Sequence, residues 1–224
     1  MSRSSKSIKQ LLARAIKMID RSRSSLKKRE LRKREVEELG GTLLSNCREI
    51  VAKVNSDDLP SARRVLARSK TSVRKFLRIT KADNKFCDWG YVIQVLQEYL
   101  EASMLYVMAG GKDQGTINLI KGFPEQSILY GLSDLIGELR RRLLKELTKG
   151  NIENARSLAY IMTEVYAKLE RISLADSVLP GFRRKLDVNR TSIDITMSEL
   201  SEEVSRKRLR DSLDSLRQLV ERSE

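Results

Sequence analysis

The chain has 224 residues, which is enough to bury a substantial core in one domain. Its 44 lysines and arginines against 30 aspartates and glutamates give a net charge of +14, so its natural partner is a polyanion such as nucleic acid. The absence of histidine excludes zinc sites with histidine ligands and hydrolases that use a histidine base, and leaves the oxygen chemistry of carboxylates.

The N-terminal region is strongly basic. Residues 1–25 hold a short amphipathic segment followed by a run of arginines and serines, and we expect a basic N-terminal arm or short helix there. A long helix is predicted to start at the basic run 27–34 and to continue to about Asn55. Such a run is more often a solvated helix face than a binding site, although the high net charge makes a binding site less improbable than usual.

The rest of the chain has helical periodicity and three prolines, which predict an all-α fold. Residues 26–204 are expected to form one helical domain. A charged helical extension, 205–224, follows it, and its leucines are typical of a further helix or a coiled coil. After the first helix, five more are expected at about 59–77, 89–108, 124–149, 151–172 and 181–204.

The most informative helix covers residues 94–108, which are apolar over most of the helix circumference. The exceptions follow the spacing i, i+3, i+4, i+7, so they form one narrow stripe: Gln94, Gln97, Glu98 and Glu101. This helix should be largely buried. Its two carboxylates must then be paired, hold a cation or line a wet cavity, because a buried unpaired charge is too costly to keep.

A second acidic pair, Asp134 and Glu138, shares a helix face at i, i+4. Packed helices approach to ~8–10 Å, so four carboxylates from two such helices could converge on one divalent cation. Mg²⁺ or Mn²⁺ prefers this kind of oxygen cluster. The alternative is that the acids are surface ion-pair partners, each contributing under ~1 kcal/mol.

These two stretches carry a family resemblance. Residues 96–102, Leu-Gln-Glu-Tyr-Leu-Glu-Ala, are similar to the motif LQEYVEA, and residues 131–141 are similar to GxADLTGELMR, with the acids in register. Weaker similarity runs from about Leu31 to Leu200. The chain resembles the translin family, and within it the branch of translin-associated factor X.

The resemblance implies a protomer of about seven helices that assembles into a closed homo-oligomeric barrel, up to an octamer, with the acids facing the lumen. It also implies a metal-dependent endoribonuclease. Its catalytic acids and Mg²⁺ (or Mn²⁺) ligands would be Glu98, Glu101, Asp134 and Glu138. In eukaryotes the family divides binding and catalysis between two subunits, so a translin-family paralogue is a further partner to consider.

Basic side chains near these motifs are the candidates for contacting RNA or single-stranded DNA. The better electrostatic candidates before the apolar helix are Arg78, Lys81 and Lys85, with Arg141 and Lys145 beyond Glu138 on the other helix. Trp89 could stack on a base together with Tyr91, but a lone tryptophan at the start of an apolar helix is more often a packing residue.

Two other functional classes stay open. One is a non-catalytic oligomer that binds RNA or single-stranded DNA; the other is a scaffold whose long helices pair with proteins, which only the C-terminal extension favours. Cys47 and Cys87 have no metal-binding spacing and are interpreted as reduced core residues. The sequence contains no run of the ~18 apolar residues that a membrane-spanning helix needs and no hydrophobic signal-peptide core. We therefore expect a cytoplasmic protein that does not bind a membrane.

Overall fold

The structure is a computed structural model that describes residues 3–222 except 84–85, 87–88 and 113–114, with side chains from residue 11 onward. Within these ranges the chain forms helices and no strand, which confirms the all-α prediction. The helices are α1 (Arg3–Asn55), α2 (Leu59–Lys81), α3 (Gly90–Met108), α4 (Thr116–Ile120), α5 (Glu125–Thr148), α6 (Ile152–Glu170) and α7 (Phe182–Glu221).

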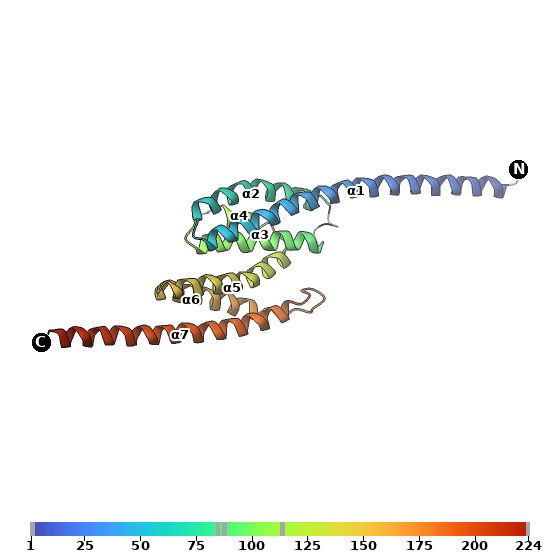
Figure 1. The fold of residues 1–224 in the computed structure, drawn as a ribbon. Helices are drawn as coiled ribbons and strands as arrows, with labels where there is room; N and C mark the ends of the chain where they lie inside the picture. The colour runs from blue at the N-terminus through green and yellow to red at the C-terminus, as the bar shows by residue number, and fades with distance from the viewer. Residues whose placement is uncertain (1–2, 84–85, 87–88, 113–114, 223–224) are drawn as a thin grey trace.

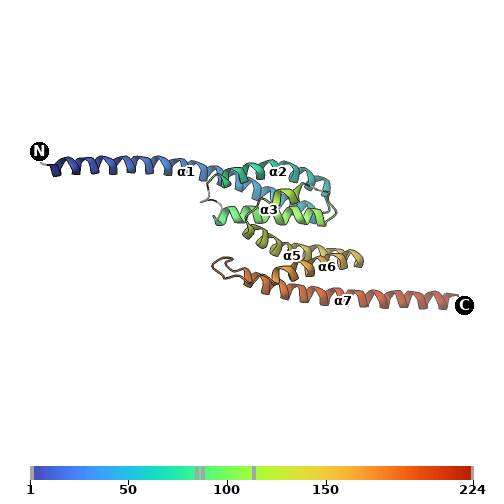
Figure 2. The same ribbon diagram turned by 180° about the vertical axis from the view of Figure 1, so that it is seen from behind.

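Helices α3 and α5 lie at the centre of the molecule and pack against each other. Helices α1 and α2 cover α3 on one side, and α6 and α7 cover α5 on the other (Figure 1). The view from behind shows the same order of layers (Figure 2). The two longest helices, α1 and α7, therefore lie on opposite sides of the α3–α5 pair.

Helix α3 is buried as its apolar sequence predicts. The fully or nearly fully buried side chains on it include Val95, Leu96, Tyr99, Leu100 and Leu105. Burial of such side chains stabilises the fold by about 1.5–3 kcal/mol each before the loss of conformational entropy is counted. The polar stripe of α3 is what this packing leaves facing α5.

A glycine sets the distance between α3 and α5. A Cβ atom at Gly131 of α5 would lie 2.9 Å from the carbonyl oxygen of Gln97 and 3.1 Å from Cδ2 of Leu100. Only a residue without a side chain permits this approach of the two backbones. The close crossing holds the polar stripe of α3 against the acidic face of α5.

Helix α1 corrects the expectation of a separate N-terminal arm and of a helix that begins at Lys27. It is one continuous helix from Arg3 to Asn55, about 80 Å long at 1.5 Å per residue. No proline or glycine occurs before Gly40, so nothing in the sequence ends the helix in its N-terminal half. Arg29, over the ring of Phe86, and Lys33, over that of Trp89, contact the bundle, and Val36 is the first described side chain of α1 to be buried. The turns before Arg29 project beyond the bundle (Figure 1).

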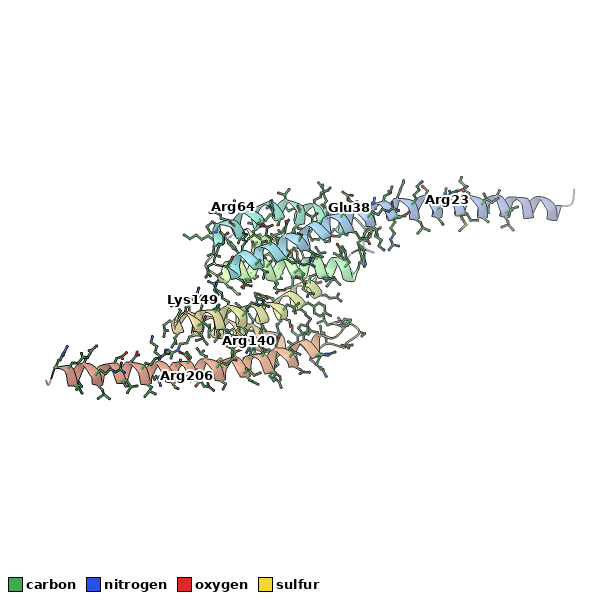
Figure 3. All side chains as sticks on the ribbon, viewed as in Figure 1. Arg23, Glu38, Arg64, Arg140, Lys149 and Arg206 are labelled. Carbon is green, nitrogen blue, oxygen red and sulfur yellow. The ribbon has the colours of Figure 1, made fainter. Side chains whose placement is uncertain are left out.

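Helix α7 projects in a similar way at the opposite end of the molecule. Its last buried residue is Leu200, and the helix continues to Glu221. Side chains on both projections point into solvent, as at Arg23 and Arg206 (Figure 3).

The apolar surface left for neighbouring chains does not come from α3, which is covered by the protomer's own helices. Helices α6 and α7 contribute some of it within the bundle, at Tyr160, Ile195 and Met197. Most of the exposed large apolar side chains lie on the two projections. They include Leu11, Leu12, Ile16, Met18, Ile19 and Leu26 on α1, and Leu209, Leu213, Leu216, Leu219 and Val220 on α7.

Several smaller features of the structure agree with the predictions from the sequence. Asp58 caps α2 by accepting a hydrogen bond from the backbone N–H of Ser61 at 3.1 Å, and the helix runs one turn past the predicted end at Leu77. The five-residue α4 was not predicted.

Cys47 is a buried free thiol as predicted, whereas Cys87 lies outside the described residues. None of the helices, as far as the structure describes them, has the length and apolar character required to span a bilayer.

Candidate functional site

The four predicted acids come together where α3 crosses α5. Glu98 and Glu101 lie on the polar stripe of α3, and the charges of Glu98, Asp134 and Glu138 all act on the carboxyl group of Glu101. All four side chains are partly buried. The register predicted from the i, i+4 spacings therefore places the acids in one cluster, with Glu101 at its centre.

The electrostatics of the cluster are dominated by burial. Burial, and then the charges of Asp134, Glu98 and Glu138, raise the pKa of Glu101 to about 8. Burial and the charge of Asp134 also raise the pKa of Glu98. At neutral pH Glu101 therefore keeps its proton, because burial and the neighbouring acids make a further negative charge at this position unfavourable.

Asp134 is held by two partners from different helices. Nε2 of Gln97 on α3 donates a hydrogen bond to Oδ2, and the ammonium of Lys185 on α7 forms an ion pair with Oδ1. Lys185 also lowers the pKa of both Glu98 and Glu101, against the larger effect of burial. The sequence did not lead us to assign this lysine to the site.

Glu138 lies at the other end of the cluster, with its side chain only 14% exposed. Nδ2 of Asn55, at the end of α1, donates a hydrogen bond to Oε2 at 3.2 Å. Nε of Arg141, one turn along α5, lies 3.5 Å from Oε1. The cluster is thus bordered by α1, α3, α5 and the start of α7.

The donor set suits a hard divalent cation. Carboxylate oxygens are the ligands that Mg²⁺ and Mn²⁺ prefer, and a bound cation would relieve the repulsion that raises the pKa of Glu101. Within the described residues, no three or more acidic or cysteine side chains already stand in metal-binding geometry. Lys185 and Asn55 instead occupy oxygens of Asp134 and Glu138.

Cys47 closes the site from the side of α1 and is not reactive. It is 1% exposed, and burial together with the charges of Glu98 and Glu101 raises its pKa to about 12. A thiol with such a pKa stays protonated and is a poor nucleophile or metal ligand.

A second polar cluster forms around Asp57, next to the C-terminal half of α5. Asp57 accepts hydrogen bonds from Arg142 at 2.5 Å, Lys145 at 2.7 Å and Lys149 at 2.8 Å. The hydrogen bonds from Lys145 and Lys149 hold the pKa of this carboxyl well below its usual range. Lys145 also donates to the carbonyl oxygen of Asn55 at 2.7 Å. Lys145, predicted to contact nucleic acid, is thus engaged in joining α5 to the end of α1.

The other predicted basic residues are placed differently. Arg78 and Lys81 are exposed in the last turn of α2, and the side chain of Arg141 is 70% exposed beside the acids. Lys85 lies outside the described residues. Their contact with nucleic acid stays a prediction.

Trp89 is in an aromatic cluster. Its ring centroid lies 5.9 Å from that of Phe86 and 5.2 Å from that of Tyr91, and Nζ of Lys33 lies 5.2 Å above it. These contacts favour the packing interpretation of Trp89 over base stacking.

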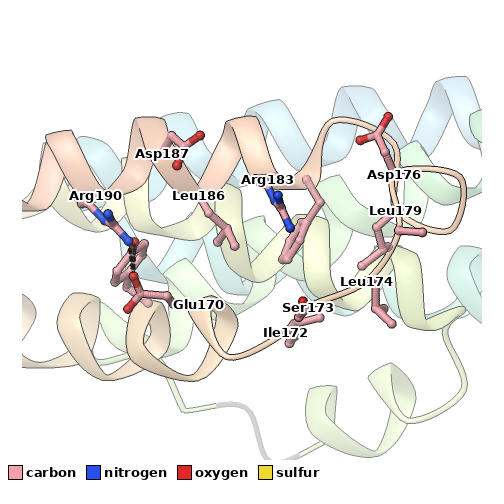
Figure 4. Close-up of a pocket in the computed structure, with 13 residues that line it drawn as sticks. Glu170, Ile172, Ser173, Leu174, Asp176, Leu179, Arg183, Leu186, Asp187 and Arg190 are labelled. Carbon is pink, nitrogen blue, oxygen red and sulfur yellow. Dashed lines mark hydrogen bonds and ion pairs between the residues drawn. The ribbon is translucent and has the colours of Figure 1, made fainter.

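A separate cavity of about 520 Å³ lies between the end of α6 and the start of α7 (Figure 4). It is lined by apolar side chains such as Leu174 and Leu186, and an ion pair between Arg190 and Glu170 crosses one end. None of the four clustered acids lines it. It is therefore not the continuation of the carboxylate site.

The residues that form the carboxylate cluster fall within a match to a known protein family. A model of the translin family matches residues 1–195, which include both acidic motifs, helices α1 to α6 and the start of α7. The chain belongs to the translin family. This family member continues for 29 residues past the match, into the projecting part of α7.

Individual relatives are distant in sequence and similar in fold. An uncharacterised protein of Methanocaldococcus jannaschii is 24% identical over 180 residues, which are 80% of this chain and 79% of that protein. The structure of AfC3PO bound to duplex RNA superposes with a TM-score of 0.71 at 21% identity, covering 84% of this chain and 97% of that one. The structure of apo-NeC3PO gives a TM-score of 0.70 at 24% identity, covering 83% and 96%.

The sequence missed three members of the site. Gln97 belonged to the predicted polar stripe but was not assigned a partner, and Lys185 lies in the arginine- and lysine-rich run near the start of α7. Asn55 gave no signal, because its contact with Glu138 joins residues 83 positions apart. Spacing along one helix cannot reveal such contacts.

Proposed function

We propose that this chain is a metal-dependent endoribonuclease of the translin-associated factor X type, cleaving RNA phosphodiester bonds inside an oligomeric barrel. The observation that carries the proposal is the convergence of Glu98, Asp134 and Glu138 around the carboxyl group of Glu101, whose pKa is raised to about 8. Perturbed carboxyl groups that cluster in this way are typical of functional sites, since stability alone disfavours them.

Glu98, Glu101, Asp134 and Glu138 would hold Mg²⁺ or Mn²⁺. When bound, the metal supplies an activated water and neutralises charge at the scissile phosphate. Gln97 orients Asp134 through its amide hydrogen bond. Lys185, which pairs with Asp134, would bind a phosphate oxygen beside the acids once it is released from that carboxylate.

RNA is the proposed substrate because the chain carries a charge of +14 and because a structure of similar fold, AfC3PO, is known in complex with duplex RNA. Exposed Arg78, Lys81 and Arg141 would contact the phosphate backbone without reading sequence. Single-stranded DNA would satisfy the same contacts.

Enclosure in an oligomer would limit indiscriminate cutting by a basic nuclease. We propose a closed homo-oligomer, up to an octamer, that can include a translin-family paralogue. Light scattering coupled to size exclusion tests this. A stable monomer of 25.7 kDa that cleaves RNA at the full rate would eliminate the enclosed site.

Catalysis is tested with the double variant Glu98→Gln, Asp134→Asn. We expect it to lose Mg²⁺-dependent cleavage of a labelled RNA while it keeps RNA binding. The matched control, Glu153→Gln with Asp194→Asn, removes two exposed acids on α6 and α7 and should cleave normally. Equal cleavage by both double variants, or cleavage insensitive to EDTA, would refute the assignment.

The alternative is a non-catalytic oligomer that binds RNA or single-stranded DNA. It is favoured by the contacts of Asp134 and Glu138, whose oxygens already have Lys185 and Asn55 as partners. In that case Mn²⁺ would bind no more tightly to the chain than to the Glu98→Gln, Asp134→Asn variant, which calorimetry would show directly.

A further inference from the structure

The C-terminal projection of α7 carries an apolar stripe that its own protomer does not cover. Beyond Leu200 the helix leaves the bundle and continues to Glu221 (Figure 1). Five large apolar side chains on it are between 48% and 62% exposed, and four of them form the stripe: Leu209, Leu213, Leu216 and Val220. The match to the translin family ends at residue 195, so this stripe lies outside the family region.

The stripe faces away from the protomer's core. Helix α7 packs on the bundle through one face, which includes Leu186, Ile193 and Leu200. At 3.6 residues per turn, the four exposed residues lie about 160–220° around the helix from Leu200. The stripe therefore lies on the opposite side of α7 from the face that packs on the bundle, so the protomer's own packing of α7 leaves it uncovered.

The spacing of the stripe is that of a coiled coil. Successive members are four, three and four residues apart, which corresponds to positions d, a, d and a of two heptads. Leu209 and Leu216 then occupy d positions, and Leu213 and Val220 occupy a positions. Leucine at both d positions and the β-branched Val220 at one of the two a positions agree with the pattern that favours two strands.

The charge around the stripe suits a second copy of this chain. Residues 209–222 contain three arginines (Arg210, Arg217, Arg222) and three acids (Asp211, Asp214, Glu221), so this segment is neutral in a chain of net charge +14. Within residues 209–222, two identical copies can therefore approach without net repulsion. A polyanion would find no excess of positive charge here.

The flanking positions also favour one orientation. With Leu209 at d, Arg210 and Arg217 occupy e positions, and Ser205 and Ser212 occupy g positions. In a parallel pair each arginine faces a serine of the partner, since e lies against g. An antiparallel pair would bring the arginines of the two strands together.

We propose that the α7 projection pairs with the same segment of a second copy in a short parallel two-stranded coiled coil. Two heptads are fewer than the three or four that usually support an independent coiled coil. The pairing therefore strengthens contacts between protomers that already belong to one assembly, where the effective concentration of the partner helix is high. It does not depend on the nuclease function.

The test compares two double variants of the full chain. Leu213→Lys with Leu216→Lys places charges on the stripe, whereas Ser215→Lys with Gln218→Lys adds the same charges on the opposite side of the helix. We expect the stripe variant to raise the protein concentration at which the assembly dissociates by about 100-fold, and the control to leave it unchanged. Sedimentation velocity over a dilution series measures this, with RNA binding followed in parallel.

Orientation is tested with Leu209→Cys, which a parallel pair in register would bring into disulfide range of its counterpart, while Ser215→Cys would stay apart. We expect an oxidised dimer for the first and none for the second. The pairing would be overturned if the two lysine double variants dissociated at the same protein concentration. It would also be overturned if the stripe variant lost RNA binding while its assembly kept the same mass, because nucleic acid would then be the partner of the stripe.

Discussion

The contact between α3 and α5 at Gly131 gives the sharpest test of how the site is built. In Gly131→Ala the new Cβ atom would lie 2.9 Å from the backbone oxygen of Gln97, which cannot move without shifting α3. Gly137, two turns along the same helix, is exposed and has open space around its Cα atom. The two glycines thus provide a matched pair of alanine substitutions in one helix.

Two contributions determine the expected change in the free energy of unfolding of each variant. Each substitution gains about 0.8–1 kcal/mol of helix propensity, because glycine is a poor helix former. Only Gly131→Ala also forces packed elements apart, which typically costs about 1–3 kcal/mol. The gain is common to both variants, so the difference between them isolates the contact. We expect Gly137→Ala to be stabilised and Gly131→Ala to be about 1–3 kcal/mol less stable than it.

Thermal unfolding followed by circular dichroism at one fixed protein concentration measures this difference. For a chain of this size about 1 kcal/mol corresponds to roughly 2–4 °C in Tm. The Gly131→Ala variant should also bind Mn²⁺ more weakly, because separating the helices separates the acids on α3 from those on α5. The reasoning is refuted if the two variants melt together, or if Gly131→Ala is destabilised while its metal affinity equals that of Gly137→Ala.

Three further predictions follow. Lys185→Met should raise Mn²⁺ affinity about 10-fold by calorimetry, because it removes a positive charge that competes for Asp134; an unchanged affinity would place the metal elsewhere. Asp57→Asn should lower the free energy of unfolding by about 1 kcal/mol at low salt and by less at high salt, because this side chain is 40% exposed and salt screens its ion pairs. Urea titration at two salt concentrations measures this, and a loss of stability that does not depend on salt would contradict it. In EDTA, Tm should fall as pH rises from about 5.5 to 8.5, since folded Glu101, with its pKa raised to about 8, holds a proton that the unfolded chain has already released; Glu101→Gln should flatten this slope, and a slope that persists in the variant would assign it to other groups.

The positions of the acids were predictable because they depend on one helix at a time. The i, i+3, i+4 and i+7 spacing fixes which side chains share a face, and the apolar remainder of α3 fixes that this face is enclosed. The same reasoning placed Leu209 to Val220 in a coiled-coil pattern. Facts that a helical period determines could thus be derived without the structure.

Features that depend on tertiary contacts could not be derived. Lys185 reaches Asp134 across 51 residues, and Lys145 is held by Asp57, which has a left-handed backbone conformation with φ of 61° at the α1–α2 turn. The continuous helix α1 is a different case. Its sequence lacks helix-breaking residues before Gly40, but the run of arginines and serines led us to expect an interruption.

The carboxylate cluster is a poor way to stabilise a helical bundle, and this is the strongest physical reason to regard it as functional. Replacing buried charged groups by apolar residues of similar size is often neutral or stabilising, so packing alone does not require four acids between α3 and α5. Here the protein holds them with Lys185, Gln97 and Asn55, and the pKa of Glu101 is still raised to about 8. Ionisation of Glu101 is thus unfavourable in the folded chain, and a divalent cation would make it favourable. If a cation binds there as proposed, its binding would be coupled to the stability of the α3–α5 contact, and metal affinity and helix packing should change together in any variant of that crossing.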